Sequence, residues 1–196
     1  MSHANYRQNA LFHTHDRPMT PISTKPSKSV HHAHAGTASH ERRSSTEQEK
    51  IEALVRDIYQ RRIHFNRLVG FKVTSLEPQK VTMSFSMRDE LVGNFVQGRL
   101  HGGVIGTALD SVGGLAVSVG LMEKFANESM EQIGMRFGRV GTIDLRVDYL
   151  RPGLGDHFVA SAQVLRLGGR IASVQMQLAD SQGELVATGS AAYIIT

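Results

Sequence analysis

The sequence from residue 101 to residue 119 reads HGGVIGTALDSVGGLAVSV and contains one formal charge, Asp110, near its centre. This pattern predicts an α-helix with one apolar stripe, as expected for a helix that packs on a sheet. The stripe consists of Ile105, Leu109, Val112, Ala116 and Val119. We therefore expect a buried, glycine-rich core helix. Its lone carboxylate needs a partner or a solvent-filled site, because an isolated buried charge is costly.

A membrane-spanning helix is the alternative for this stretch, since about 20 apolar residues are enough to cross a bilayer. Asp110 at its centre would cost about 2.5 to 3.5 kcal/mol on insertion. The flanks also lack the aromatic belts that anchor such helices at the membrane surface. We therefore expect no membrane span.

Alternating apolar and polar residues around this helix predict strands. The turns between them, such as Gly168-Gly169, are short, and turns of that length join antiparallel neighbours. The expected strands cover residues 71–77, 81–87, 142–151, 157–167, 170–180 and 184–195. A capping signal at residues 45–48 precedes an amphipathic helix over residues 51–68. Together these elements predict an α+β fold.

The composition limits the chemistry and the organisation of the chain, which has 196 residues, a net charge of +4 and no cysteine. Disulfides, thiolate nucleophiles and cysteine-containing zinc sites are therefore excluded. The first fifty residues hold seven of the ten histidines, and they contain no apolar run long enough for a core or a secretory signal. We predict a disordered, basic, His-rich tail over residues 1–44, one domain over residues 45–196 and a cytoplasmic location. The basic residues do not line up on one helix, so we expect no nucleic-acid partner.

The start of the glycine-rich helix is suited to bind an oxyanion. The backbone N–H groups of Gly102 and Gly103 are open to a ligand oxygen, and the helix dipole favours negative charge there. Asp110 follows Gly103 by close to two turns, about 10 Å along the axis. Asp110 cannot easily reach a carbonyl that is bound at Gly103 of its own chain. Two such helices that run antiparallel across a two-fold axis would place Asp110 of one chain near Gly103 of the other. The spacing therefore suggests a site shared between two subunits.

The segment 98–103, with Asp110 nine residues after His101, resembles the HGG motif of the PaaI-like group in the 4-hydroxybenzoyl-CoA thioesterase superfamily. The resemblance extends through residues 142–153 and covers about residues 65–196; within the superfamily the sequence resembles the bacterial YigI-like acyl-CoA thioesterases. It implies a hotdog fold, in which an antiparallel sheet of about six strands wraps around the central helix. It also implies hydrolysis of acyl-CoA without a metal or an organic cofactor, in a homodimer or a tetramer.

The resemblance assigns roles to the helix residues. Asp110 corresponds to the acidic residue that acts as general base or as nucleophile. Gly103, with Gly102 beside it, corresponds to the backbone donor that polarises the thioester carbonyl. His101 corresponds to the motif histidine that orients the helix entrance, although capping of the helix alone would also explain it.

Residues outside the helix complete the expected site. Asn94 resembles the asparagine of a substrate-positioning loop, but it precedes His101 by seven residues where six is usual. Thr142 falls where related enzymes place a hydroxyl that positions water; an ordinary strand residue is the alternative. Arg170 and Arg151 could contact CoA phosphates, although both could also be solvated turn residues.

Several alternatives remain open at this level. A hotdog-fold hydratase or dehydratase also uses a histidine and a carboxylate, and a non-catalytic acyl-CoA sensor would bind without turnover. The methionine-bearing connection over residues 121–141 is either a lid over an acyl chain or a surface excursion. Apolar residues near the helix favour medium- to long-chain fatty acyl substrates.

Overall fold

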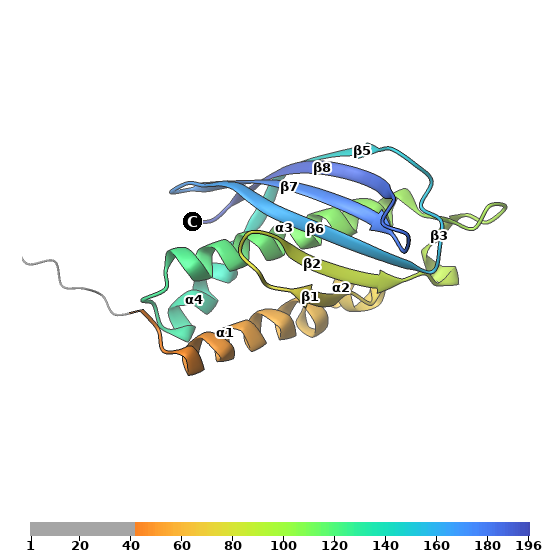
Figure 1. Ribbon diagram of the computed structural model, residues 1–196. Coiled ribbons are helices and arrows are strands. Elements are labelled where there is room, and N and C mark those ends of the chain that lie inside the picture. Colours follow the sequence, from red (N-terminus) through yellow and green to blue (C-terminus); the bar gives the residue numbers. More distant parts are fainter. Residues whose placement is uncertain (1–41) are drawn as a thin grey trace, which may run out of the picture. The chain divides into compact units, whose positions relative to one another are not determined.

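The computed structural model describes residues 42–196 and contains a six-stranded antiparallel sheet that covers a long helix, α3 (Gly102–Lys124) (Figure 1). The order of strands is β1-β2-β6-β7-β8-β5. Their bounds are β1 (Lys72–Ser75), β2 (Val81–Ser86), β5 (Gly141–Tyr149), β6 (His157–Leu167), β7 (Ile171–Asp180) and β8 (Leu185–Ile194). The α+β class and all six predicted strands are confirmed. Residues 1–41, which hold most of the predicted tail, lie outside the described range.

The predicted apolar stripe of α3 is buried as expected, and each of its five residues is at most 4% exposed. Facing it, alternate residues of β7 from Ala172 to Leu178 point inward and are also buried. In the described part of the chain, α3 is the one helix long and apolar enough to cross a bilayer. However, 67% of its apolar stretch of 18 residues is buried inside the fold. These contacts confirm the expected core helix.

The predicted continuous helix over residues 51–68 is wrong, because the structure divides it into three pieces. They are α1 (Ser45–Asp57), the π-helical η1 (Ile58–Arg62) and α2 (His64–Val69). The N–H of Ile63 bonds to the carbonyl of Ile58, five residues back, at 3.0 Å, and the backbone of Ile63 is extended. This i→i+5 bond is that of a π turn, which contains one residue more than an α-helical turn. Tyr59 and Asn66 on either side of the break are both buried.

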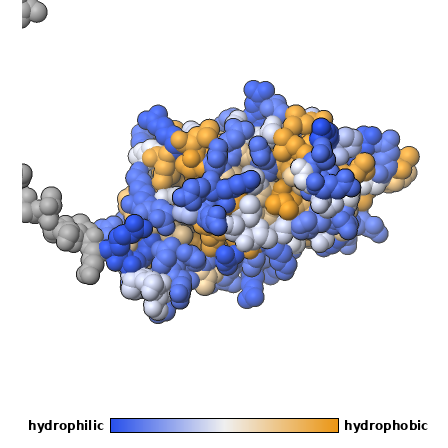
Figure 2. Space-filling model, viewed as in Figure 1, coloured by the Kyte–Doolittle hydropathy of each residue, from blue (hydrophilic) through white to orange (hydrophobic). Residues whose placement is uncertain are grey.

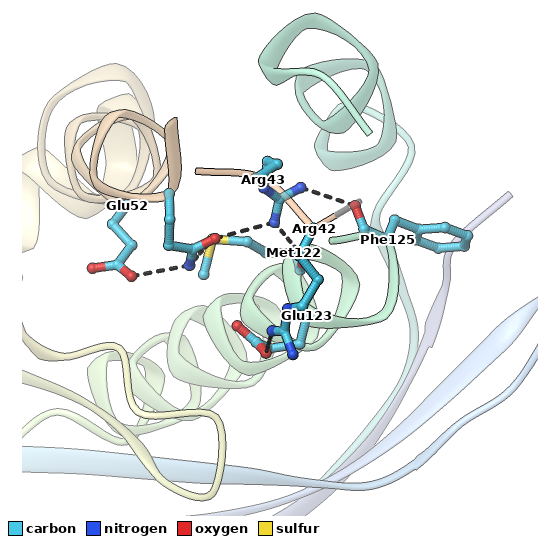
Figure 3. Close-up of polar contacts among 7 residues, drawn as sticks. Arg42, Arg43, Glu52, Met122, Glu123 and Phe125 are labelled. Atoms are coloured by element: carbon cyan, nitrogen blue, oxygen red, sulfur yellow. Dashed lines mark hydrogen bonds and ion pairs between the residues drawn. The ribbon is translucent and has the colours of Figure 1, made fainter. Parts of the chain in front are cut away.

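The N-terminal boundary of the domain lies earlier than the predicted residue 45. Ser44 caps α1 and forms a capping box with Glu47, one residue before the predicted signal. The guanidinium of Arg43 donates to the carbonyls of Met122 (2.6 Å) and Phe125 (2.9 Å) near the C-terminal end of α3 (Figure 3). The carbonyl of Met122 lies in the last turn of α3, where carbonyls lack partners within the helix, and that of Phe125 also accepts the N–H of Glu128 at 3.0 Å. Residues 42–44 therefore belong to the folded domain, whereas the sequence pattern places them in the tail.

The connection after α3 contains a helix that the sequence analysis does not predict. α4 (Met130–Phe137) begins at Ser129, which forms a capping box with Gln132, and it packs against α3 and α1. Ile133 is fully buried, which fixes α4 to the rest of the domain. The connection is therefore a packed element and not a surface excursion.

A short hairpin leads into α3. It consists of β3 (Val92–Asn94) and β4 (Arg99–Leu100), and a 3-10 turn, η2 (Asp89–Leu91), precedes it. Its loop exposes Phe95 and Val96 by 90% and 77%, and apolar colour extends to this end of the molecule in Figure 2. The hairpin fixes the start of α3, because the N–H of His101 bonds to the carbonyl of Leu91 at 2.8 Å.

Candidate active site

A cavity of about 530 Å³ lies along α3 and contains Asp110. Its apolar lining residues come from the N-terminal helices, from the end of α4 and from the residue before β5, and hydroxyl and amide groups line it as well. The lining residues that we use below are Ile58, Tyr59, Ile63, Phe65, Asn66, Asp110, Ser111, Ser118, Phe137, Val140, Thr142 and Tyr193.

Two hydroxyl groups from the sheet bond to Asp110. Thr142 Oγ1 donates to Oδ1 of Asp110 at 2.7 Å. The hydroxyl of Tyr193 donates to the main-chain oxygen of Asp110 at 2.9 Å and lies 3.3 Å from the same Oδ1. Thr142 on β5 and Tyr193 on β8 are directly paired across the two strands, and the register shifts by one residue at Ile143. Such a bulge changes the direction of the neighbouring side chains, and here the side chain of Thr142 points toward Asp110.

Tyr193 reaches the helix because Gly113 has no side chain. A Cβ at Gly113 would lie 2.2 Å from the Tyr193 hydroxyl, so any other residue would displace the ring. Burial, followed by the negative charge of Asp110, raises the pKa of Tyr193 far above its usual value. The phenol therefore stays protonated and acts as a hydrogen-bond donor.

The residues that line the cavity also include a second set of paired polar groups. The hydroxyl of Ser111 donates to Asn66 Oδ1 at 2.9 Å, and Asn66 Nδ2 donates to the carbonyl of Tyr59 at 3.1 Å. The hydroxyls of Tyr59 and Ser118 share a hydrogen bond of 3.1 Å. Burial raises the pKa of Tyr59 to about 12. These groups satisfy one another, so they form a closed polar floor rather than a second set of ionised groups.

The imidazole of His101 caps the N-terminus of α3. The N–H of Gly103 donates to His101 Nδ1 at 2.9 Å, so the predicted backbone donor is already paired within its own chain. An accepting Nδ1 carries no proton, and the neutral ring then has its proton on Nε2, which is free to donate. The hydroxyl of Tyr149 donates to the carbonyl of Gly102 at 3.1 Å. This end of α3 therefore presents the Nε2–H group of His101 beside the two glycines.

The structure does not bring every predicted site residue to Asp110. Asn94 caps its own turn, because its Oδ1 accepts from the N–H groups of Val96 and Gln97 at 3.1 and 3.2 Å. Arg151 forms an exposed ion pair with Glu184, and Arg170 is an exposed turn residue. The structure places these three residues as turn residues and assigns them no contact with the cavity.

Comparison with known proteins identifies the family. A sequence profile of the thioesterase superfamily matches residues 97–187. Escherichia coli YigI, a medium/long-chain acyl-CoA thioesterase, is 35% identical over 147 residues, which are 75% of this chain and 95% of YigI. The chain belongs to the thioesterase superfamily.

Solved structures of superfamily members agree with the fold. A Shewanella oneidensis protein related to the thioesterase superfamily has a TM-score of 0.73 and 34% identity, over 79% of this chain and 100% of its own. A Syntrophus aciditrophicus protein described as a candidate thioesterase has a TM-score of 0.70 and 41% identity, over 78% and 100%. The six-stranded sheet around α3 is the hotdog fold of this superfamily.

Asp110 and Thr142, both predicted as site residues from the sequence, line the cavity together with Tyr193, Tyr59 and Asn66, which were not predicted. The sequence of β8 contains a pattern that indicates Tyr193. Its buried positions alternate, and the residues at these positions, Ala187, Gly189 and Ala191, are small up to Tyr193. A polar-tipped aromatic residue at the end of such a series faces the core helix. Tyr59 and Asn66 carried no such signal, since their inward orientation depends on the π turn.

Proposed function

We propose that this protein hydrolyses medium- to long-chain acyl-CoA thioesters, with active sites shared between two copies of the chain. The observation that carries the proposal is the pairing of Asp110 with Thr142 at a cavity that is also lined by apolar side chains. Asp110 is the one carboxyl group among the described residues that line this cavity. The similarity to YigI supports the choice of substrate.

The chemistry follows from the carboxylate. As general base, Asp110 takes a proton from water while the water oxygen bonds to the thioester carbon. The C–S bond then breaks, and the leaving thiolate receives a proton to give free CoA and the acid. As nucleophile, a carboxylate oxygen of Asp110 instead bonds to the thioester carbon, the C–S bond breaks and CoA leaves as the thiolate; water then hydrolyses the resulting anhydride to the acid and the free carboxylate of Asp110. In both routes the carbonyl oxygen becomes negative and needs donors.

The donors for that oxygen come from the N-terminus of α3 in the partner copy. Within one chain, the spacing of about 10 Å along the helix separates Asp110 from Gly103. β5 is an edge strand of the sheet, and its residues Ile143 and Tyr149 are 54% and 57% exposed. Edge strands with exposed apolar residues pair readily with a second copy. A two-fold axis beside β5 would place Asp110 of one copy near His101 and Gly103 of the other.

The length of the cavity supports the substrate class. Asp110 and Ser118 both line it, and eight helical residues span about 12 Å along the axis. An extended chain advances roughly 1.2 Å per atom, so about ten carbons fit between them. The apolar lining residues Ile58, Phe65 and Phe137 suit an unsubstituted hydrocarbon chain.

A thiol-release assay over acyl-CoA substrates of increasing chain length, with an aryl-CoA for comparison, tests this function. We expect kcat/KM to be highest for chains of about ten carbons, and Asp110→Asn to remove thiol release while leaving the fold intact. Release of thiol from saturated substrates also separates hydrolysis from hydration, which frees no thiol. Tight binding of acyl-CoA without release would instead indicate a sensor. Equal rates for D110N and the wild type would refute the assigned role of Asp110.

Shared sites are tested by mixing two inactive chains in one dimer. D110N and Gly103→Val, co-expressed with different tags, should regain about a quarter of the wild-type activity, because half of randomly formed dimers are mixed and each has one intact site. The G103V side chain would displace His101, since a Cβ there lies 2.9 Å from Nδ1. The matched control is D110N mixed with D110A, which should stay inactive. No recovery in the first mixture would exclude sharing.

A further inference from the structure

We propose that Tyr193 is a positioning residue for Asp110. Together with Thr142, its hydroxyl fixes Oδ1 of Asp110 so that Oδ2 is the oxygen presented to water or to the thioester. This inference rests on the proposed function, and it concerns a residue that neither the motif nor the helix pattern includes.

The first observation is that both donors face the same carboxylate oxygen. Thr142 Oγ1 lies 2.7 Å from Oδ1 and the Tyr193 hydroxyl lies 3.3 Å from it. Among residues 42–196, no side chain or backbone group forms a hydrogen bond with Oδ2. The carboxylate therefore has one oxygen held by the protein and one available for reaction.

The second observation is that Tyr193 also holds the backbone beneath the carboxylate. Its hydroxyl donates to the main-chain oxygen of Asp110 at 2.9 Å. A hydroxyl at this point fixes the position of the Asp110 backbone as well as its side chain. Gly113 makes the approach possible.

The third observation is that both donors come from paired strands. Thr142 and Tyr193 lie opposite each other in β5 and β8, so the distance between their side chains is set by the sheet. Tyr193 is 1% exposed and is packed on all sides. Groups on packed strands hold a reacting group more accurately than groups on loops do.

The ionisation states of the two buried tyrosines fit hydrogen-bond donors. Burial and the charge of Asp110 raise the pKa of Tyr193, so its hydroxyl keeps its proton over the working range of an enzyme. The other titratable group that lines the cavity is Tyr59 on η1, and it is also protonated there. From α4, β5 and the segment between them the cavity receives Phe137, Val140 and Thr142, which carry no charge. A change in the acidic limb of the rate profile that occurs in a Tyr193 variant, and not in a Tyr59 variant, therefore reports on the contact between Tyr193 and Asp110.

The test is Tyr193→Phe, assayed by the loss of thioester absorbance from decanoyl-CoA across the acidic and neutral pH range. We expect kcat to fall about tenfold, the lower end for a hydrogen bond to a charged group, because the contact with Oδ1 is 3.3 Å. KM should stay nearly constant, and the acidic limb should move to higher pH, since the ionised carboxylate loses a donor. Incorporation of 3-fluorotyrosine at position 193 keeps the shape and strengthens the donor, so it should move the limb to lower pH.

Tyr59→Phe is the matched control. It also removes one buried phenol hydroxyl from this cavity, but that hydroxyl bonds to Ser118 and not to Asp110. Whatever it does to KM, its acidic limb should coincide with that of the wild type. Thermal unfolding of all variants shows that each is folded at the assay temperature.

The outcomes separate this inference from the proposed function. Wild-type kcat and an unmoved acidic limb in Y193F, with D110N inactive, would overturn the positioning role and leave the hydrolase assignment intact. A limb that moves equally in Y193F and Y59F would also overturn it, because the effect would then be general. If D110N keeps full activity, both the mechanism and the positioning role are wrong.

Discussion

The role of His101 can be divided experimentally into capping and donation. Its Nδ1 accepts the N–H of Gly103 at 2.9 Å, and its Nε2–H is free to polarise a carbonyl. His101→Ala removes both functions. Loss of an N-cap costs about 1 kcal/mol, and for a domain of about 150 residues this corresponds to a decrease in Tm of about 2 to 4 °C. His101→Asn keeps the cap, because asparagine is among the best N-cap residues, but it lacks the imidazole donor.

Urea unfolding measures the capping role of His101, and thiol release measures its role as a donor. We expect H101A to lose about 1 kcal/mol of unfolding free energy and H101N to stay within about 0.5 kcal/mol of the wild type. Both should lose kcat by about tenfold or more, because each lacks the donor for the developing oxyanion. Wild-type stability in H101A would refute the capping role. Wild-type kcat in H101N would show that His101 serves as a cap alone.

Three further predictions concern stability. Arg43→Ala should lower the free energy of unfolding by about 1 to 3 kcal/mol in urea titrations, because carbonyls at the end of α3 lose a charged donor. Arg43→Lys lacks the planar guanidinium, so it should retain only part of this stabilisation. Hydrogen bonding to Arg136 lowers the pKa of Glu128, so this stabilisation is present above the usual glutamate pKa and is lost as the pH falls through the lowered one. Glu128→Gln should therefore flatten the acidic part of the stability profile. Gly113→Ala should cost about 1 to 3 kcal/mol and also lower kcat, because its Cβ would collide with the Tyr193 hydroxyl; unchanged stability would contradict the close approach.

The strands were predictable because each has a simple alternation and ends at a turn residue. β6 has the predicted ends, and β1 is shorter than predicted because the chain turns after Ser75, whose hydroxyl accepts the N–H of Glu77. The break at Ile63 was missed because the five-residue step from Ile58 to Ile63 was included in one helical series, although it is one residue longer than an α-helical spacing allows. α4 is short and mixed in composition, and its stability comes from the burial of Ile133.

In the candidate site too, single residues could be predicted where a local pattern marks them and not where a tertiary contact places them. Asp110 was evident as the one charge in an apolar helix, and Thr142 followed from resemblance. The contact between Tyr193 and Asp110 depends on the register of β8 with β5 and on the bulge at Ile143, which no local pattern specifies. For Asn94 the structure shows a side chain that closes its own turn, and the substrate-positioning role that the motif suggests stays a prediction.

The glycines of α3 explain how one helix holds the Asp110 carboxylate in a defined position. Gly103 leaves room for the imidazole of His101, since an added Cβ would lie 2.9 Å from its Nδ1. Gly113 and Gly114 admit tyrosine hydroxyls, since added Cβ atoms would lie 2.2 Å from that of Tyr193 and 3.1 Å from that of Tyr59. Each glycine weakens an isolated helix by about 1 kcal/mol. The sheet and the N-terminal helices compensate through these contacts, so α3 is ordered by what surrounds it. Asp110 lies between Gly103 and Gly113, and its geometry is therefore set by tertiary structure rather than by the helix that carries it.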